Sequence, residues 1–210
     1  MASVEFEASG PLLFPAQPEA APSAPSFAAV RRGGRPRLAL VSTYSDLCGI
    51  AAYTKSLEKQ LADAFDVRVF DLNQFLLRAT HARVRRFADR HIQEICREIR
   101  EFDAVNLQLE HGTLGRSCRD IFRRFTWIAR AAPRLSVTFH TVFEPNEFDF
   151  KGFFRELLSL NLGKAIALRS QYNRAHLLSA GVATHLRRAQ RLKPVAIIVH
   201  TRRELWHMRY

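Results

Sequence analysis

Short apolar runs alternate with longer stretches of helical periodicity along most of this chain, and this alternation strongly constrains the fold. Each apolar run has the length of a strand that is buried on both faces of a sheet. The runs cover residues 38–41, 67–70, 104–109, 135–139 and 195–199. Between them, apolar residues recur at helical spacing, which predicts amphipathic helices. These helices are expected at about 50–65, 84–99, 118–128 and 152–192, the last one interrupted at Gly163 and Gly181.

Strands that alternate with helices in this way imply right-handed crossovers between parallel strands. The sequence therefore predicts a doubly wound parallel sheet of the Rossmann-like α/β class. Such sheets bind ligands beyond the carboxyl ends of their strands. Polar residues and glycines gather where the predicted strands end, in residues 43–51, 110–115, 140–145 and 200–201.

The first 35 residues do not share the alternation. They contain five prolines among alanine, serine and glutamate, and they end in a cluster of arginine and glycine. This composition is typical of a disordered leader. Residues 36–210 are expected to form one domain, which is long enough to bury a core without disulfides or metals.

The cysteines and histidines of the chain indicate the redox state of its thiols and whether it can form a metal site. The three cysteines are odd in number and show no CxxC spacing, which favours reduced thiols and a cytoplasmic location. The eight histidines are scattered, and neither HExxH nor DxD occurs, so no metal site is predicted. The sequence also lacks the GxGxxG fingerprint of NAD-binding folds.

The formal charge of +12 suggests attraction to nucleic acid, anionic lipid or phosphorylated small molecules. Only five of the 32 basic residues are lysine, in a chain that is also rich in alanine and proline. A general arginine bias with solvated helix faces is therefore the simpler interpretation. The phenylalanines at 148–154 are more typical of packing than of a base-stacking platform, so nucleic acid is not favoured as a partner.

Four segments that end predicted strands resemble the amino-terminal half of family-4-type glycosyltransferases, which have the two-domain GT-B architecture. The segments are RLALVSTY (37–44) with CGIAAYTKSL (48–57), VNLQLEHG (105–112), VTFHTV (137–142) and IIVHTRRE (197–204). They occur in the order of the family and span about residues 37–205. The resemblance implies that this domain is the acceptor-side half of a GT-B fold.

The resemblance places the loop after the first strand against the diphosphate of a nucleotide-sugar. Gly49 and Ile50 would face this donor substrate. A glycine at a helix start lets backbone amides approach a phosphate, and the helix dipole favours the anion. The alternative interpretation is a plain tight turn beside a buried Cys48.

The other strand ends supply the remaining candidate residues. By resemblance, His140 would be the catalytic residue, hydrogen-bonded to the transferred sugar, with Thr141 beside it. An imidazole can donate to a hydroxyl or share developing charge near neutral pH. Glu110 and His111 would flank the acceptor groove, or else cap the following helix and orient its loop. His200 is interpreted as a structural residue near the hinge.

The implied activity is retaining, metal-independent transfer from a nucleotide-sugar to a saccharide or lipid-linked acceptor, as in polysaccharide biosynthesis, without a further cofactor. Family members hold the donor mainly through a carboxyl-terminal domain with a Glu-x7-Glu motif. No two glutamates of this chain are eight positions apart. The donor domain is therefore expected to be absent, and the truncated chain is expected to be inactive alone or to depend on a donor-domain polypeptide or on self-association.

A second hypothesis belongs to a different class. It is a non-catalytic basic α/β module that binds anionic lipid or polyphosphate. Such binding would depend on salt and would be insensitive to substitution of Gly49 or His140. Basic helix faces could also bring a glycosyltransferase to the inner face of the membrane as a peripheral protein.

Overall fold

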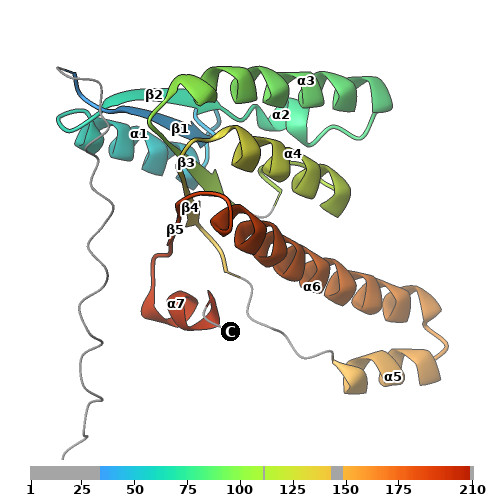
Figure 1. Cartoon of the computed structure of the whole chain (residues 1–210). Coiled ribbons are helices and arrows are strands. Elements are labelled where there is room, and N and C mark those ends of the chain that lie inside the picture. The colour runs from blue at the N-terminus through green and yellow to red at the C-terminus, as the bar shows by residue number, and fades with distance from the viewer. Residues whose placement is uncertain (1–33, 111, 143–148, 209–210) are drawn as a thin grey trace, which may run out of the picture.

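The computed structural model describes residues 34–110, 112–142 and 149–208, and it confirms the predicted fold class. Five parallel strands form one sheet in the order β2-β1-β3-β4-β5 (Figure 1). The strands are β1 (Arg37–Ser42), β2 (Asp66–Asp71), β3 (Ala104–Leu109), β4 (Leu135–Phe139) and β5 (Val195–Ile198). Each lies at one of the predicted apolar runs. The predicted leader lies outside the described residues except for residues 34 and 35.

The helices divide between the two faces of this sheet (Figure 1). One face is contacted by α1 (Gly49–Leu61), and the other is covered by α3 (Ala82–Glu98), α4 (Cys118–Ala131) and α6 (Leu162–Gln190). Right-handed crossovers require this division. The connection from β1 to β2 runs across the sheet in one direction, and the connections after β2, β3 and β4 all run in the opposite direction, so their helices lie on the opposite face. The short elements are α2 (Gln74–Leu77), the 3-10 turn η1 (Ile99–Glu101), α5 (Phe150–Leu158) and α7 (Arg202–Met208).

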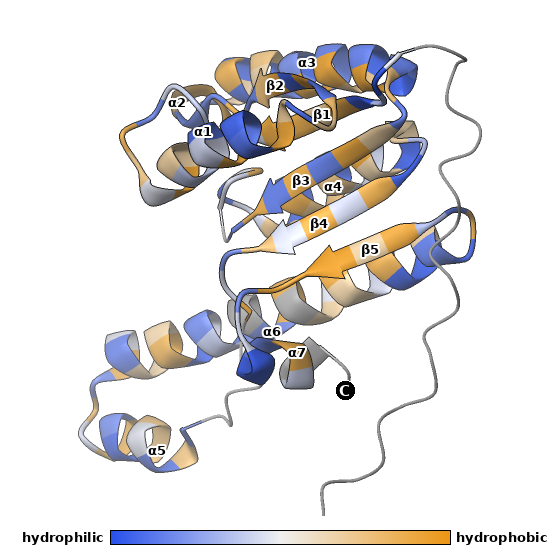
Figure 2. Cartoon of the chain, turned by 90° about the vertical axis from the view of Figure 1, so that its left-hand side faces the viewer, coloured by the Kyte–Doolittle hydropathy of each residue, from blue (hydrophilic) through white to orange (hydrophobic). Residues whose placement is uncertain are grey.

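The two faces of the sheet differ in polarity. Alternate residues of a strand point to opposite faces, so Val105 and Leu107 of β3 enter the apolar core under α3, α4 and α6. Asn106 and Gln108 point the other way and are also buried. Figure 2 shows this second face of β3, β4 and β5 in front of α4 and α6, with hydrophilic colours on β3. At the edge strand β5, this face leaves Ile198 43% exposed.

The region 152–192 forms two helices: the interruption predicted at Gly163 lies slightly earlier, at residues 159–161, and the one predicted at Gly181 does not occur. The break falls between α5 and α6, and α6 then runs unbroken for 29 residues. Gly181 serves packing instead, because a Cβ there would collide with the ring of Phe122 on α4. Glycine lets the two helices approach closely at this point. Among the described residues no helix, α6 included, is both long and apolar enough to cross a membrane.

Candidate functional site

The loops after β1, β3, β4 and β5 leave the same edge of the sheet, because the strands are parallel. From β1 the chain passes through α1 to β2, whereas from β3 it passes through α4 to β4 on the opposite side. Doubly wound sheets bind ligands where the connections diverge in this way. The structure thus confirms that the four predicted loops share one edge, which carries Gly49, Glu110, His140 and His200.

The start of α1 is open to solvent. Gly49 is the first residue of the helix, and a Cβ there would meet no described atom within 4 Å. The side chain of Ile50 is buried, so this residue can offer a ligand only its backbone N–H. Cys48 is exposed, which contradicts the interpretation of a turn beside a buried cysteine. The first N–H groups of a helix lack intrahelical acceptors and can bind an anion.

Three aromatic rings meet at the carboxyl ends of β4 and β5. The ring centroid of His140, directly after β4, lies 5.1 Å from that of His200 and 5.1 Å from that of Tyr53 on α1. Tyr53 and His200 are 5.5 Å apart, edge to face. Helix α1 therefore places an aromatic side chain against the predicted catalytic histidine. These rings form the part of the candidate site that is most closely assembled.

A chain of polar side chains leads from the sheet to His140. The strand register sets Asn106 opposite Ser136 and Gln108 opposite Thr138. Asn106 Nδ2 donates to Ser136 Oγ at 2.9 Å and to Thr138 Oγ1 at 3.0 Å. Gln108 Nε2 donates to Asn106 Oδ1, and Gln108 Oε1 lies 2.7 Å from His140 Nε2. Gln108 is fully buried, so its amide cannot turn freely.

This chain fixes which nitrogen of His140 carries the proton. The Ser136 hydroxyl donates to the carbonyl of Val105 at 3.4 Å and therefore accepts from Asn106. Each amide is then oriented in turn, and Gln108 presents an oxygen to His140. The Nε2–H of His140 is thus already used as a donor. In the neutral ring Nδ1 remains as an acceptor, so a bound hydroxyl would donate to His140 and not accept from it.

Burial and a neighbouring charge keep this ring neutral. Burial lowers the pKa of His140 below 6.5, and His200 lowers it further, while Glu204 opposes the shift. A neutral imidazole at physiological pH can accept a proton or a hydrogen bond at Nδ1. The site therefore offers a base of fixed orientation near the switch point.

The sequence predicts a structural role for His200, and the structure places its ring against those of His140 and Tyr53. The residues that follow it hold it there. Glu204 Oε2 accepts from the backbone N–H of His200 at 3.0 Å and of Thr201 at 2.9 Å. The N–H of Glu204 donates to Thr201 Oγ1 at 3.1 Å. This reciprocal pair is a capping box at the start of α7, and the sequence pattern Thr-x-x-Glu could have indicated it.

The loop after β3 is organised by its own turn and by α2. Thr113 Oγ1 donates to the carbonyl of Glu110 at 2.9 Å, and Gln74 Nε2 donates to the carbonyl of Thr113 at 2.9 Å. Glu110 does not cap the next helix, because the Ser117 side chain accepts from Asp120 N at the start of α4. That alternative for Glu110 is therefore wrong. His111 lies outside the described residues.

A buried arginine network fastens the same loop to α3 and α4. The side chain of Arg124 is 0% exposed, and its Nε donates to Asp89 Oδ1 at 2.9 Å. Its Nη1 donates to the carbonyl of Leu114 at 2.8 Å and to the carbonyl of Leu77 at 3.1 Å. Burial alone would raise the pKa of Asp120, but hydrogen bonds from Arg85 and Ser117 hold it below the usual value. The guanidinium of Arg124 thus fixes the position of the loop after β3.

Thr141 follows His140 and is exposed at the same edge. Its hydroxyl is therefore open to a ligand that contacts His140. No group of three or more His, Cys, Asp or Glu side chains is close enough to hold a metal within residues 34–110, 112–142 and 149–208. The predicted substrate-binding residues thus include two open positions, Gly49 and Thr141, and one buried side chain, Ile50.

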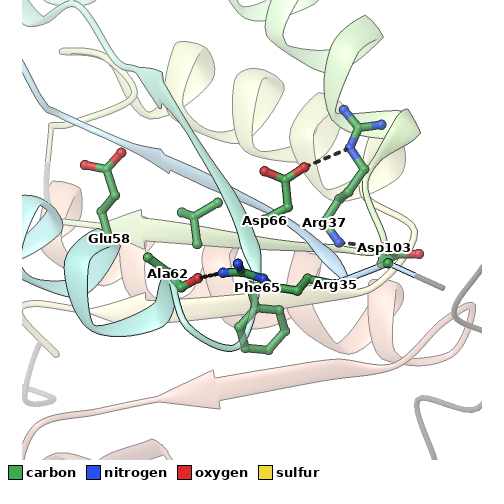
Figure 3. Close-up of a pocket in the computed structure, with 9 residues that line it drawn as sticks. Arg35, Arg37, Glu58, Ala62, Phe65, Asp66 and Asp103 are labelled. Atoms are coloured by element: carbon green, nitrogen blue, oxygen red, sulfur yellow. Dashed lines mark hydrogen bonds and ion pairs between the residues drawn. The ribbon is translucent and has the colours of Figure 1, made fainter.

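A shallow cleft of about 660 Å³ lies at the opposite edge of the sheet, near the starts of β1 and β2 (Figure 3). Its charged groups are already engaged with the chain. The backbone N–H of Arg37 donates to Asp103 Oδ2 at 2.7 Å, its Nε lies 3.9 Å from Asp66 Oδ2, and the Arg35 side chain donates to the carbonyl of Ala62. Because these polar groups serve the fold and none of the predicted site residues lines this cleft, it is not the candidate site.

No protein-family model, curated protein sequence or solved structure matches the chain. The fold is that of a Rossmann-like α/β domain, in which the rings of Tyr53, His140 and His200 meet at the carboxyl edge of the sheet.

Proposed function

We propose that this chain is the acceptor-side domain of a glycosyltransferase that transfers a sugar from a nucleotide-sugar to a saccharide or lipid-linked acceptor, with retention and without a metal. The observation that carries the proposal is the oriented, neutral imidazole of His140 beside Tyr53 at the ligand-binding edge. The four sequence segments that resemble family-4-type glycosyltransferases meet at this same edge.

The local chemistry supports a division of roles. The backbone N–H groups at Gly49 and Ile50 are suited to a diphosphate, because the first N–H groups of a helix lack intrahelical acceptors and lie at the positive end of the helix dipole. His140 Nδ1 is suited to accept from a sugar hydroxyl, and Thr141 offers a second hydrogen-bonding group next to it. Glu110 lies across the switch point, where an acceptor hydroxyl would have to approach.

Sugar transfer also needs groups that stabilise charge on the leaving diphosphate and exclude water. The sequence lacks the Glu-x7-Glu spacing with which the donor half of the family holds the nucleotide-sugar. We therefore propose that catalysis requires a donor domain in addition to these residues, which a partner polypeptide could supply. The isolated chain should bind nucleotide-sugars weakly.

The proposal is tested by purifying the tagged full chain from its own cells and assaying the recovered material with UDP-, GDP- and ADP-linked hexoses. We expect a co-purifying polypeptide with a Glu-x7-Glu motif and measurable sugar transfer. His140→Ala should lower the rate, while His81→Ala, at an exposed position before α3, should leave it unchanged. Transfer that is equal in both variants would remove His140 from the mechanism, and recovery without any transfer would refute the enzyme proposal.

The hypothesis of a basic lipid- or polyphosphate-binding module remains the contrasting outcome. It would predict salt-dependent binding that survives substitution of Gly49 and His140. Arg85 is not suited to carry such binding, because its guanidinium donates to Asp120 Oδ1 at 2.8 Å. Arg86 is exposed and is the residue to substitute in that test.

A further inference from the structure

Helix α5 and the first half of α6 form a hairpin that extends beyond α4 (Figure 1). From Leu162 to Leu177, Ala165 is the only buried residue among the side chains that are described. Burial resumes at Leu178, where α6 joins the core. At 1.5 Å per residue, the exposed half of α6 is about 24 Å long. The turn between the two helices is therefore carried well clear of the sheet.

The hairpin tip, defined as Phe154, Leu158, Leu160, Leu162 and Ile166, is apolar and exposed. The three leucines around the turn are 83%, 85% and 56% exposed. Phe154 lies one helical turn before Leu158, and Ile166 lies one turn after Leu162, so an apolar stripe runs along each helix to the turn. Contiguous apolar surface of this kind marks an interaction site.

Leu160 stands in a conformation that favours glycine. Its φ is +55°, its N–H donates to the carbonyl of Leu157 at 3.1 Å, and the N–H of Asn161 donates to the carbonyl of Glu156 at 2.9 Å. These bonds define a Schellman motif, in which glycine is the usual residue at this position. A leucine here strains the backbone, and its exposed side chain gains little packing in return. A contact between the Leu160 side chain and a molecule outside the chain would account for a leucine at this strained position.

The charges around the hairpin tip are mainly positive. Residues 149–173 contain four basic residues and two acidic ones. Lys151 and Arg155 border the apolar stripe of α5, and Lys164 is exposed on α6. Asp149 caps the start of α5, remote from the turn, and Glu156 lies 3.5 Å from the guanidinium of Arg155. The tip thus combines apolar insertion groups with cations and suits an anionic lipid surface.

We propose that the hairpin tip inserts into the interfacial region of a membrane that contains anionic lipid. Its apolar side chains would enter the boundary of the acyl chains, and Lys151 and Lys164 would contact headgroup phosphates. A lipid surface fits better than a protein because the tip is narrow and projecting, whereas a standard protein interface uses about 20–30 residues from each partner. This inference does not depend on the proposed glycosyltransferase activity.

Docking in this way would also orient the candidate site. The carboxyl ends of β3, β4 and β5 point towards the side from which the hairpin projects (Figure 2). Helix α6 leads back antiparallel to β5, so its start must lie on that side. The edge that carries His140 would therefore face the membrane surface.

The test is flotation of the full chain with phosphatidylcholine vesicles that contain phosphatidylglycerol, compared with phosphatidylcholine alone. We expect binding to the anionic vesicles and about tenfold weaker binding for Leu158→Ser combined with Leu160→Gly, since buried methylene groups dominate such partitioning. Leu192→Ser is the matched control, because Leu192 is 82% exposed beyond the far end of α6. It should bind as the wild type does.

Leu160→Gly alone separates a binding defect from misfolding. Glycine relieves the strain at this position, so the variant should be at least as stable as the wild type while it binds more weakly. A Leu160→Trp variant should show blue-shifted tryptophan emission with anionic vesicles. Equal binding by the tip variants and the control would overturn the proposal. So would failure of the wild type to bind, or a wild-type dimer in the absence of lipid that the tip substitutions dissociate.

Discussion

Replacement of Arg124 by methionine tests the claim that a buried guanidinium holds the loop after β3. Methionine fills a similar volume but removes the donors to Asp89 and to the carbonyls of Leu77 and Leu114, both of which belong to buried residues. Asp89 keeps a second partner, because Arg123 Nη2 lies 2.6 Å from its other oxygen. The main loss is therefore the hydrogen bonding of the two carbonyls.

The expected magnitude follows from these contacts. A hydrogen bond to a charged group contributes roughly 1.5–3 kcal/mol. Because Arg124→Met removes two such bonds, both donated by one nitrogen of the guanidinium, we expect it to lower the free energy of unfolding by about 3–5 kcal/mol. Domains of this kind are stable by only about 5–15 kcal/mol, so the change is large.

Urea unfolding followed by far-ultraviolet circular dichroism measures the effect, with Arg86→Met as the control on the exposed side of α3. The control should stay within about 0.5 kcal/mol of the wild type. Amide hydrogen exchange should show faster opening at residues 112–116 in Arg124→Met but not in the control. A loss below about 1 kcal/mol, or unchanged exchange in this loop, would refute the reasoning.

Three further changes test other parts of the structure. In thermal unfolding, Gly181→Ala should destabilise the domain by about 1–3 kcal/mol, because its Cβ meets the Phe122 ring. Gly163→Ala is the control: the space around Gly163 is open, so this change should stabilise the domain by up to about 1 kcal/mol. The pKa of His140 is lower in the folded state than in the unfolded state, so its stabilising contribution should be present above pH 6.5 and lost as the pH falls through the folded pKa. In urea unfolding measured over a pH series, His140→Phe should flatten the dependence of stability on pH in this range. Burial raises the pKa of the Cys96 thiol to about 11, so alkylation of Cys96 at pH 8 should require unfolding, and rapid labelling in the folded protein would contradict this.

The sequence determined the strand and helix pattern because burial leaves a local signature. A parallel strand that is covered on both faces must be apolar along its length, as residues 38–41 are, and a helix with one buried face must repeat its apolar residues at helical spacing. The convergence of the four loops at one edge followed from parallel strands alone. The break between α5 and α6 was predicted at the wrong residue, since the chain turns at Leu160, which is not a glycine, and α6 then continues through Gly163 and Gly181.

The tertiary structure decided how the candidate site is assembled. Asn106 and Gln108 lie two residues apart in a run that otherwise reads as a buried strand, and this is the signal that sequence reasoning missed. Their bonds to Ser136 and His140 depend on β3 and β4 being neighbours in one particular register. Strand order and register are set by contacts between residues far apart in the chain. No local pattern specifies them, and the proton position on His140 is fixed only once they are in place.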